Sequence, residues 1–157
     1  MLLSSGLEIN DPLKLLMAFA RVVYPMYDGV PVLQDNELCV PDIALSIMLN
    51  SRISGNTGAE IWKIREAVGQ GLARIPTDVD LLDVPKDGLA TETIGGISQA
   101  ITAVCKVHRA KLSVATKILH KKRPSLIPIF DSVVEGHYYT CLPPSSNLIV
   151  LAITLLP

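Results

Sequence analysis

Apolar residues recur at helical spacing in segment after segment of this chain, and this periodicity constrains the fold most. The pattern predicts helices over residues 12–24, from 41 to the turn at Ser54, over 57–72 and 91–104, from 112 to just before Pro124, and over 131–138. Alternation typical of strands is weak throughout. A length of 157 residues fits one domain. We therefore predict an all-α fold, with a compact, mainly helical domain over residues 1–142 and an apolar tail over residues 143–157.

Several helix boundaries and faces follow from local signals. Pro25 should end or kink the first helix near Tyr24. Thr57 and Glu60 form the pattern of a capping box and predict the start of the third helix. In the second helix, Ile43, Ile47 and Met48 are expected to face inward.

The scarcity of aromatic residues limits the functions open to the chain. Phe, Trp and Tyr make up 4% of the residues, so we expect a core of Leu, Ile, Val and Ala. A protein that stacks many bases or sugars is disfavoured. Trp62, Tyr138 and Tyr139 are the only plausible stacking residues.

Charge is distributed unevenly along a nearly neutral chain. Residues 1–92 hold 7 basic and 13 acidic residues, whereas residues 93–157 hold 7 basic and 2 acidic residues. All seven later bases lie between Lys106 and Arg123, and no acid occurs from Thr93 to Phe130. This basic segment, residues 106–123, is either a solvated helix face or a patch that binds the phosphates of duplex DNA.

The segment SVATKILHKKRPSLIPIFDSVV, Ser113 to Val134, resembles the helix-hairpin-helix DNA glycosylase superfamily, in diverged form. It is also similar to uncharacterised bacterial proteins that share a KRPxLIPxxD core. The resemblance implies a helix-hairpin-helix-like segment within the helical domain, with Asp131 in the place of the catalytic carboxylate. It places Ser113 where some members carry a Schiff-base lysine, so no lyase chemistry is implied.

The hairpin itself departs from the family pattern. Where members carry glycines, this chain reads His108-Arg109-Ala110-Lys111-Leu112. Glycines there permit positive φ and let backbone N–H groups approach a phosphate. In this chain, charged side chains are available to bind the phosphate in place of those backbone N–H groups. The residues expected to contact nucleic acid are Arg109, Lys111, Lys117, Lys121, Lys122 and Arg123.

Each catalytic candidate also has a structural interpretation. Asp131 is a favoured residue for a helix N-cap, and Ser132 and Glu135 beside it form a capping-box pattern. Ser113 in a first helical turn also serves commonly as a cap. Two hypotheses follow: a DNA-binding protein with monofunctional base-excision chemistry, or a non-catalytic interaction or structural protein that keeps the fold.

Other features favour a protein without a cofactor or metal. Cys39, Cys105 and Cys141 are widely spaced, which argues against a disulfide framework or a zinc site and favours a bacterial-type cytoplasm. The apolar run Leu148–Leu156 is shorter than the roughly 20 residues that span a bilayer. We expect this tail to be buried against the domain or in a homodimer.

Overall fold

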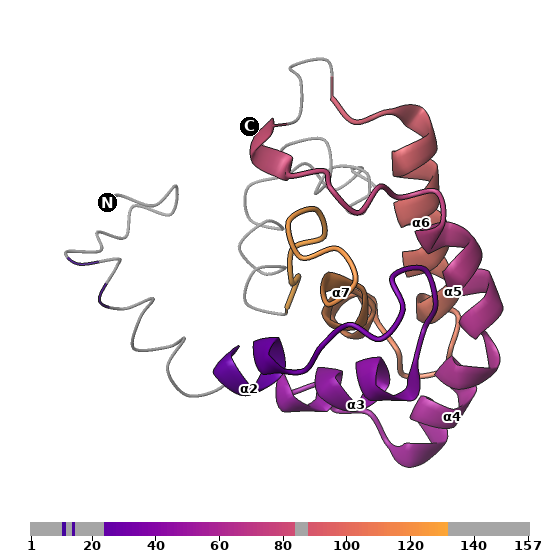
Figure 1. Cartoon of the computed structure of the whole chain (residues 1–157). Helices are drawn as coiled ribbons and strands as arrows, with labels where there is room; N and C mark the ends of the chain where they lie inside the picture. Colours follow the sequence, from indigo (N-terminus) through magenta and orange to yellow (C-terminus); the bar gives the residue numbers. More distant parts are fainter. Residues whose placement is uncertain (1–10, 12–13, 15–23, 84–87, 132–157) are drawn as a thin grey trace, which may run out of the picture. The chain divides into compact units, whose positions relative to one another are not determined.

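The computed structural model describes residues 11, 14, 24–83 and 88–131 (Figure 1). The chain divides into two compact units, Met1–Pro31 and Val32–Pro157. The described residues form helices and no strand, which confirms the all-α prediction. The elements are α2 (Tyr24–Gly29), α3 (Val40–Met48), α4 (Gly55–Lys63), α5 (Arg65–Leu72), the 3₁₀ helix η1 (Leu81–Asp83), α6 (Thr91–Cys105) and α7 (Leu112–His120).

Some predicted elements lie outside the described residues. These are most of the helix over 12–24, the helix after Asp131, the tail over 143–157, and the predicted stacking residues Tyr138 and Tyr139. In the first unit, α2 is described by itself. Pro25 is the second residue of α2.

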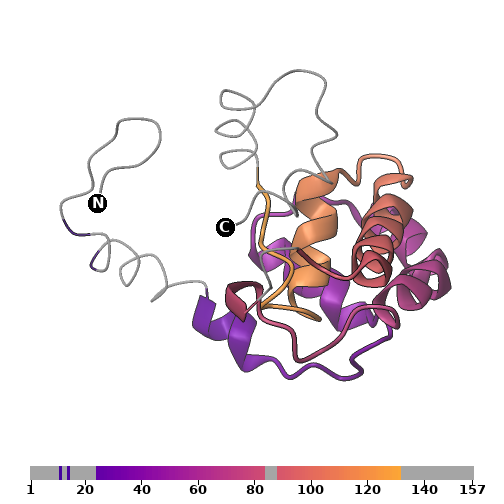
Figure 2. The same ribbon diagram turned by 90° about the horizontal axis from the view of Figure 1, so that it is seen from above.

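Helix α7 lies in the middle of the second unit, between α3 and α6 (Figures 1 and 2). Residues 114–119 are all buried, and they include Thr116 and Lys117. We expected one apolar face and one solvated basic face, and this expectation is wrong for α7. Neighbours on more than one side leave the central helix no solvated face.

Helices α5 and α6 approach each other closely at two glycines. A Cβ on Gly96 would lie 2.7 Å from the carbonyl oxygen of Gly71, and a Cβ on Gly71 would lie 2.8 Å from the carbonyl oxygen of Gly96. Real Cβ contacts are longer than this. Glycine at Gly96, which weakens an isolated helix, is therefore what allows the two backbones to pack together.

The predicted helix over 57–72 is two helices that meet at Ile64. Its first half begins at Gly55, because the Ser54 side chain accepts a hydrogen bond from the backbone N–H of Thr57 at 3.2 Å. Ser54, rather than Thr57, is thus the N-cap. The break lets α4 pack against α3 while α5 packs along α6.

The buried face of α3 differs from the predicted one. Ile43 and Leu45 are buried together with the polar residues Asp42 and Ser46. Ile47 is 53% exposed and Met48 is 36% exposed, so the prediction that both face inward is wrong. Asp42 is held inside by an ion pair, described below, and this fixes which side of α3 faces the core.

Candidate nucleic-acid interface and the buried basic cluster

The basic segment 106–123 divides into an exposed part and a buried part. Lys106, His108, Arg109 and Lys111 are exposed. The four bases of the second part are buried, and we call them the buried basic cluster: Lys117, Lys121, Lys122 and Arg123. All four were predicted to contact nucleic acid, and none of them is solvent-exposed in the structure.

Arg123 is 2% exposed, and its guanidinium donates five hydrogen bonds. The acceptors are the carbonyl oxygens of Leu72 (3.0 Å), Ile75 (2.9 Å), Asp35 (3.0 Å) and Lys122 (2.8 Å), and Oδ1 of Asn36 (2.5 Å). A guanidinium has five N–H groups, so every donor is used. Burial lowers the pKa of Arg123, and the charge of Asp35 acts in the opposite direction.

The position of Arg123 explains why a cation is stable there. Leu72 is the last residue of α5, and the carbonyl groups at a helix C-terminus carry partial negative charge. The guanidinium therefore caps α5 and joins it to the loop that carries Asp35 and Asn36. This is a structural role, and it leaves Arg123 no free donor for a phosphate.

Lys122 forms a buried ion pair with Asp42. The Lys122 Nζ lies 2.8 Å from Asp42 Oδ2 and donates to the carbonyl oxygen of Gln34 at 2.8 Å. Asp42 also accepts from the backbone N–H of Cys39 at 2.7 Å, at the start of α3. A carboxylate in the first turn is favoured by the helix dipole. The pair thus fastens the end of α7 to the start of α3.

Lys117 and Asp131 lie close enough for their charges to interact. Burial lowers the pKa of Lys117, and the carboxylate of Asp131 opposes this effect. The segment before Asp131 is fixed to α7, because the backbone N–H of Phe130 donates to Oγ1 of Thr116 at 3.0 Å. From the sequence we expected Lys117 to contact nucleic acid. The structure instead makes it the charged neighbour of the catalytic candidate.

Ser113 occupies the first turn of α7 and is half-buried. Its carbonyl oxygen accepts from Thr116 Oγ1 at 3.4 Å. Within the described part of the chain, no hydrogen bond joins Ser113 to Asp131. The structure therefore brings Lys117, rather than Ser113, into electrostatic contact with the carboxylate.

The turn between α6 and α7 contains a left-handed residue although it lacks glycine. Arg109 has φ of 67°, and the N–H of Ala110 donates to the carbonyl oxygen of Val107 at 3.0 Å. Lys111 precedes α7 but makes no side-chain capping bond. The first backbone N–H groups of α7 have no intrahelical acceptor, and the exposed bases Lys106, Arg109 and Lys111 come directly before them in the chain. We call Lys106 to Lys111 the α6–α7 hairpin.

A protein-family model matches residues 18–150 of the chain, and its description is "Family of unknown function (DUF6308)". The chain belongs to this DUF6308 family. The match includes the α6–α7 hairpin, the buried basic cluster and Asp131. Comparison of this DUF6308 protein with curated proteins and with solved structures finds no match.

The described residues of this DUF6308 domain contain no group of three or more His, Cys, Asp and Glu side chains arranged to hold a metal ion. His120 directs its Nδ1 to the carbonyl oxygen of Ile127 at 2.7 Å, which orients the ring within the fold. No helix in this same part of the chain is long and apolar enough to cross a membrane.

Sequence reasoning missed the groups that accept hydrogen bonds from the buried basic cluster. Asp42 carried a visible signal, since it follows a proline at a helix start, but that signal predicts only a cap. Asn36 and the carbonyl oxygens of Leu72 and Ile75 carried none. Acceptors of this kind become apparent only when the fold brings distant segments together.

Proposed function

We propose that this DUF6308 domain binds the phosphate backbone of duplex DNA through the α6–α7 hairpin. The observation that carries the proposal is the set of exposed bases that come directly before α7, whose N-terminus has no side-chain cap. Helix N-termini favour anions because their N–H groups lack partners and carry partial positive charge. The absence of any acid from Thr93 to Phe130 keeps this surface electropositive.

The structure narrows the proposed footprint. Only Lys106, Arg109 and Lys111 are both exposed and permanently charged in the basic segment. Neutralising one phosphate lowers the logarithm of affinity by about 0.9 per tenfold rise in salt, so three contacts give a slope of about 2.7. Six contacts, as expected from sequence alone, give about 5.4. Contacts with the backbone alone carry no base sequence information.

The test is a titration of labelled duplex DNA at several salt concentrations. We expect the slope above for the wild-type protein, and a smaller slope with weaker binding for the double variant Arg109→Gln, Lys111→Gln. Lys63→Gln is the matched control, because Lys63 is an exposed base on α4. Binding that is independent of salt, or that is equally weak in the control, contradicts the proposal.

Base-excision chemistry is the finer part of this proposal, and Asp131 supports it. Cleavage of a nucleoside glycosidic bond builds positive charge on the sugar, which a fixed carboxylate stabilises. The assay uses duplexes with a panel of damaged or mismatched bases and measures abasic product. Product lost in Asp131→Asn supports the chemistry, and background product throughout rejects it.

The second candidate function is a non-catalytic interaction domain. It is favoured by exposed large apolar side chains on α3 and α4, which include Val40 at 58% and Trp62 at 37% exposure. Single exposed apolar residues are ordinary, but a contiguous group often marks a binding surface. The peptide experiment of the next subsection tests this role independently of DNA.

A cytoplasmic location also remains our proposal. It is supported by Cys39 and Cys105, which are both free thiols, as is usual in a reducing compartment. Fractionation of expressing cells tests it, and recovery of the protein outside the cytoplasm contradicts it.

A further inference from the structure

Helix α3 presents an apolar stripe to solvent. Val40, Ala44, Ile47 and Met48 are exposed, with helical spacing. The polar residues of the same helix, Asp42 and Ser46, are the buried ones. An ordinary surface helix instead places polar residues on its outer side. A helix that is apolar on its outer side as well as its inner side is typical of one that another element covers.

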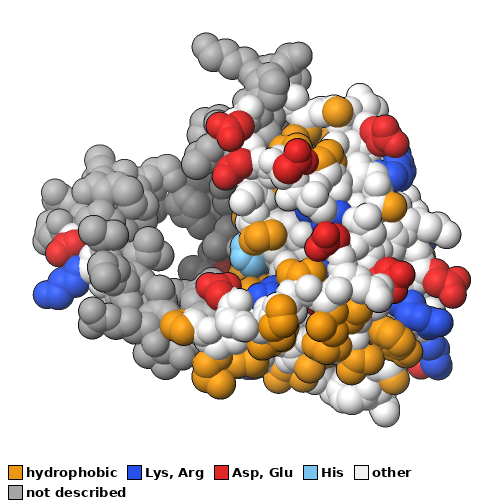
Figure 3. All heavy atoms as spheres, viewed as in Figure 1, with side chains coloured by type: hydrophobic (Ala, Val, Ile, Leu, Met, Phe, Trp, Pro, Cys, Tyr) orange, Lys and Arg blue, Asp and Glu red, His pale blue; other side chains and the backbone are white. Residues whose placement is uncertain are grey.

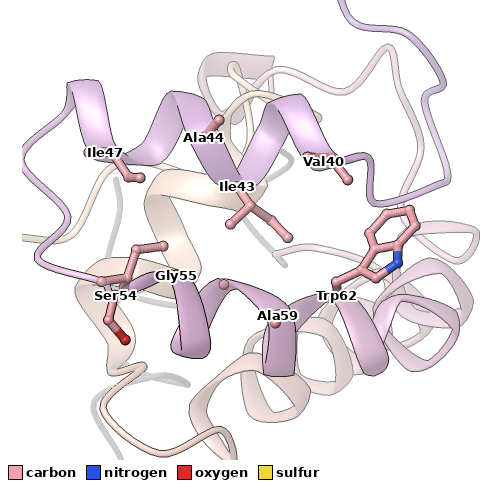
Figure 4. A pocket seen from close by; sticks show the side chains of 10 residues that line it. Val40, Ile43, Ala44, Ile47, Ser54, Gly55, Ala59 and Trp62 are labelled. Atoms are coloured by element: carbon pink, nitrogen blue, oxygen red, sulfur yellow. The ribbon is translucent and has the colours of Figure 1, made fainter.

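A groove runs beside this stripe, between α3 and α4 (Figure 4). Its volume is about 360 Å³, and its lining is almost entirely apolar. Ile43 lies between the two helices, with Trp62 at one end of the groove and Ser54 at the other. On the α4 side the groove is lined by Gly55, Gly58 and Ala59, and these small residues leave it open. Figure 3 shows hydrophobic side chains gathered along the face formed by α3 and α4.

The Trp62 end of the groove opens into a second, polar hollow of about 760 Å³. Val40 and Trp62 line both hollows. The polar hollow adds Glu37 and Glu66, together with Arg65, whose guanidinium lies 4.9 Å from the centre of the Trp62 ring. Arg65 also lies 3.8 Å from Glu66. Glu37 pairs with no cation among the described residues. The end of the groove is therefore acidic.

We propose that this groove docks an amphipathic helix of a partner protein, with apolar side chains in the groove and a Lys or Arg beside Glu37. The inference rests on the interaction role and is independent of DNA binding. The Glu37 carboxylate accepts hydrogen bonds from the side-chain amide of Gln34, but no cation among the described residues neutralises its charge. An apolar channel that ends at such a carboxylate is complementary to a helix with one apolar face and a basic residue at its edge. The groove has ten lining residues, whereas a stable dimer uses about 20 to 30 a side, which favours a helix over a second copy.

The probe is a synthetic amphipathic helix of leucine and lysine, titrated into the full chain. The control peptide keeps the leucines and replaces every lysine with glutamate. Trp62 is the only tryptophan of the chain, so its fluorescence reports directly on the groove. We expect a blue shift and saturable binding with the lysine peptide, and much weaker binding with the glutamate peptide.

Three variants locate the binding. Ile47→Lys should weaken it by roughly tenfold or more, as loss of a central apolar contact does. Glu37→Gln should weaken the lysine peptide by about two- to fivefold, the range of an exposed charge pair, without affecting the glutamate peptide. Leu33→Lys is the control, because Leu33 is exposed and does not line the groove. All three substituted side chains are exposed, so circular dichroism should show a native fold.

Several results overturn the proposal. Absence of saturable binding does so, as does equal affinity for the two peptides or unchanged affinity in Ile47→Lys. Sedimentation equilibrium adds a separate check. A dimer of the free protein that dissociates in Ile47→Lys shows that a second copy occupies the groove, which also overturns it. None of these outcomes bears on the salt-dependent DNA titration.

Discussion

Replacement of Arg123 by methionine removes the cation that joins three separate segments of the fold. Methionine has a similar length and fills much of the space, so the change isolates the loss of the five hydrogen bonds. Their acceptors include the carbonyl oxygens of Leu72 and Ile75, which remain inside the protein. Removing one partner from a buried charged network typically costs about 3 to 5 kcal/mol. The total stability of a domain is about 5 to 15 kcal/mol.

Urea unfolding followed by far-UV circular dichroism measures this loss. With a denaturant slope of about 2 kcal/mol per M, the midpoint should fall by about 2 M. Arg123→Lys keeps the charge but lacks the planar fork, so we expect an intermediate loss. If the methionine variant does not fold, the lysine variant still gives a measurable midpoint.

Arg109→Met is the matched control, since Arg109 is an exposed arginine with the same substitution. Its stability should change by less than about 0.5 kcal/mol, as for most surface positions. The two variants should also separate in the DNA titration, where only Arg109→Met weakens binding directly. A loss in Arg123→Met no larger than that of the control would refute the reasoning.

Three further predictions concern other positions. Gly96→Ala should lower the free energy of unfolding by about 1 to 3 kcal/mol, because the new methyl group overpacks against α5. Gly95→Ala meets only the flexible end of an arginine side chain and should be tolerated. Thermal unfolding of the two variants compares these effects. Asp42→Asn leaves the Lys122 ammonium buried without a carboxylate and should lower the free energy of unfolding by about 3 kcal/mol or more. Adding Lys122→Met should recover part of that loss. If urea unfolding shows no recovery, the pairing is contradicted. Burial raises the pKa of Cys105 above its ordinary value of 9.0. Above pH 9 the thiol therefore ionises first in the unfolded state, and the stability of the fold decreases as pH rises. This decrease should be smaller in Cys105→Ser, and identical pH profiles of stability would contradict the prediction.

Helical periodicity predicted the elements well where the apolar pattern was regular. The helix expected from Thr91 begins at Thr91, and Ile97, Ile101 and Val104, which recur at helical spacing, are buried. The start of α4 was displaced because Ser54 and Thr57 are both good caps, and sequence alone did not rank them. A break at Ile64 has no glycine or proline to signal it.

The candidate site was harder to predict because the usual rule for lysine and arginine failed. Long basic side chains are mostly exposed unless they are paired, so the basic segment was interpreted as a surface. Lys122 and Arg123 instead reach acceptors as far as 88 residues away in the chain. Backbone carbonyl groups supply most of these acceptors, and every residue has one. No pattern of residue types therefore distinguishes a buried cation of this kind from a solvated one.

The hydrogen bonds of Arg123 also have a consequence for the order of folding. Four of the five join positions separated by 48 to 88 residues, so the polar groups of α5 and the early loop acquire their partner only when α7 and the turn after it are in place. During synthesis the residues of α3 to α6 emerge first. We expect the segments before residue 123 to form fluctuating helices, and the domain to become cooperative in a late step when this arginine docks. Long-range contacts of this kind slow folding because the intervening chain must first be closed into a loop.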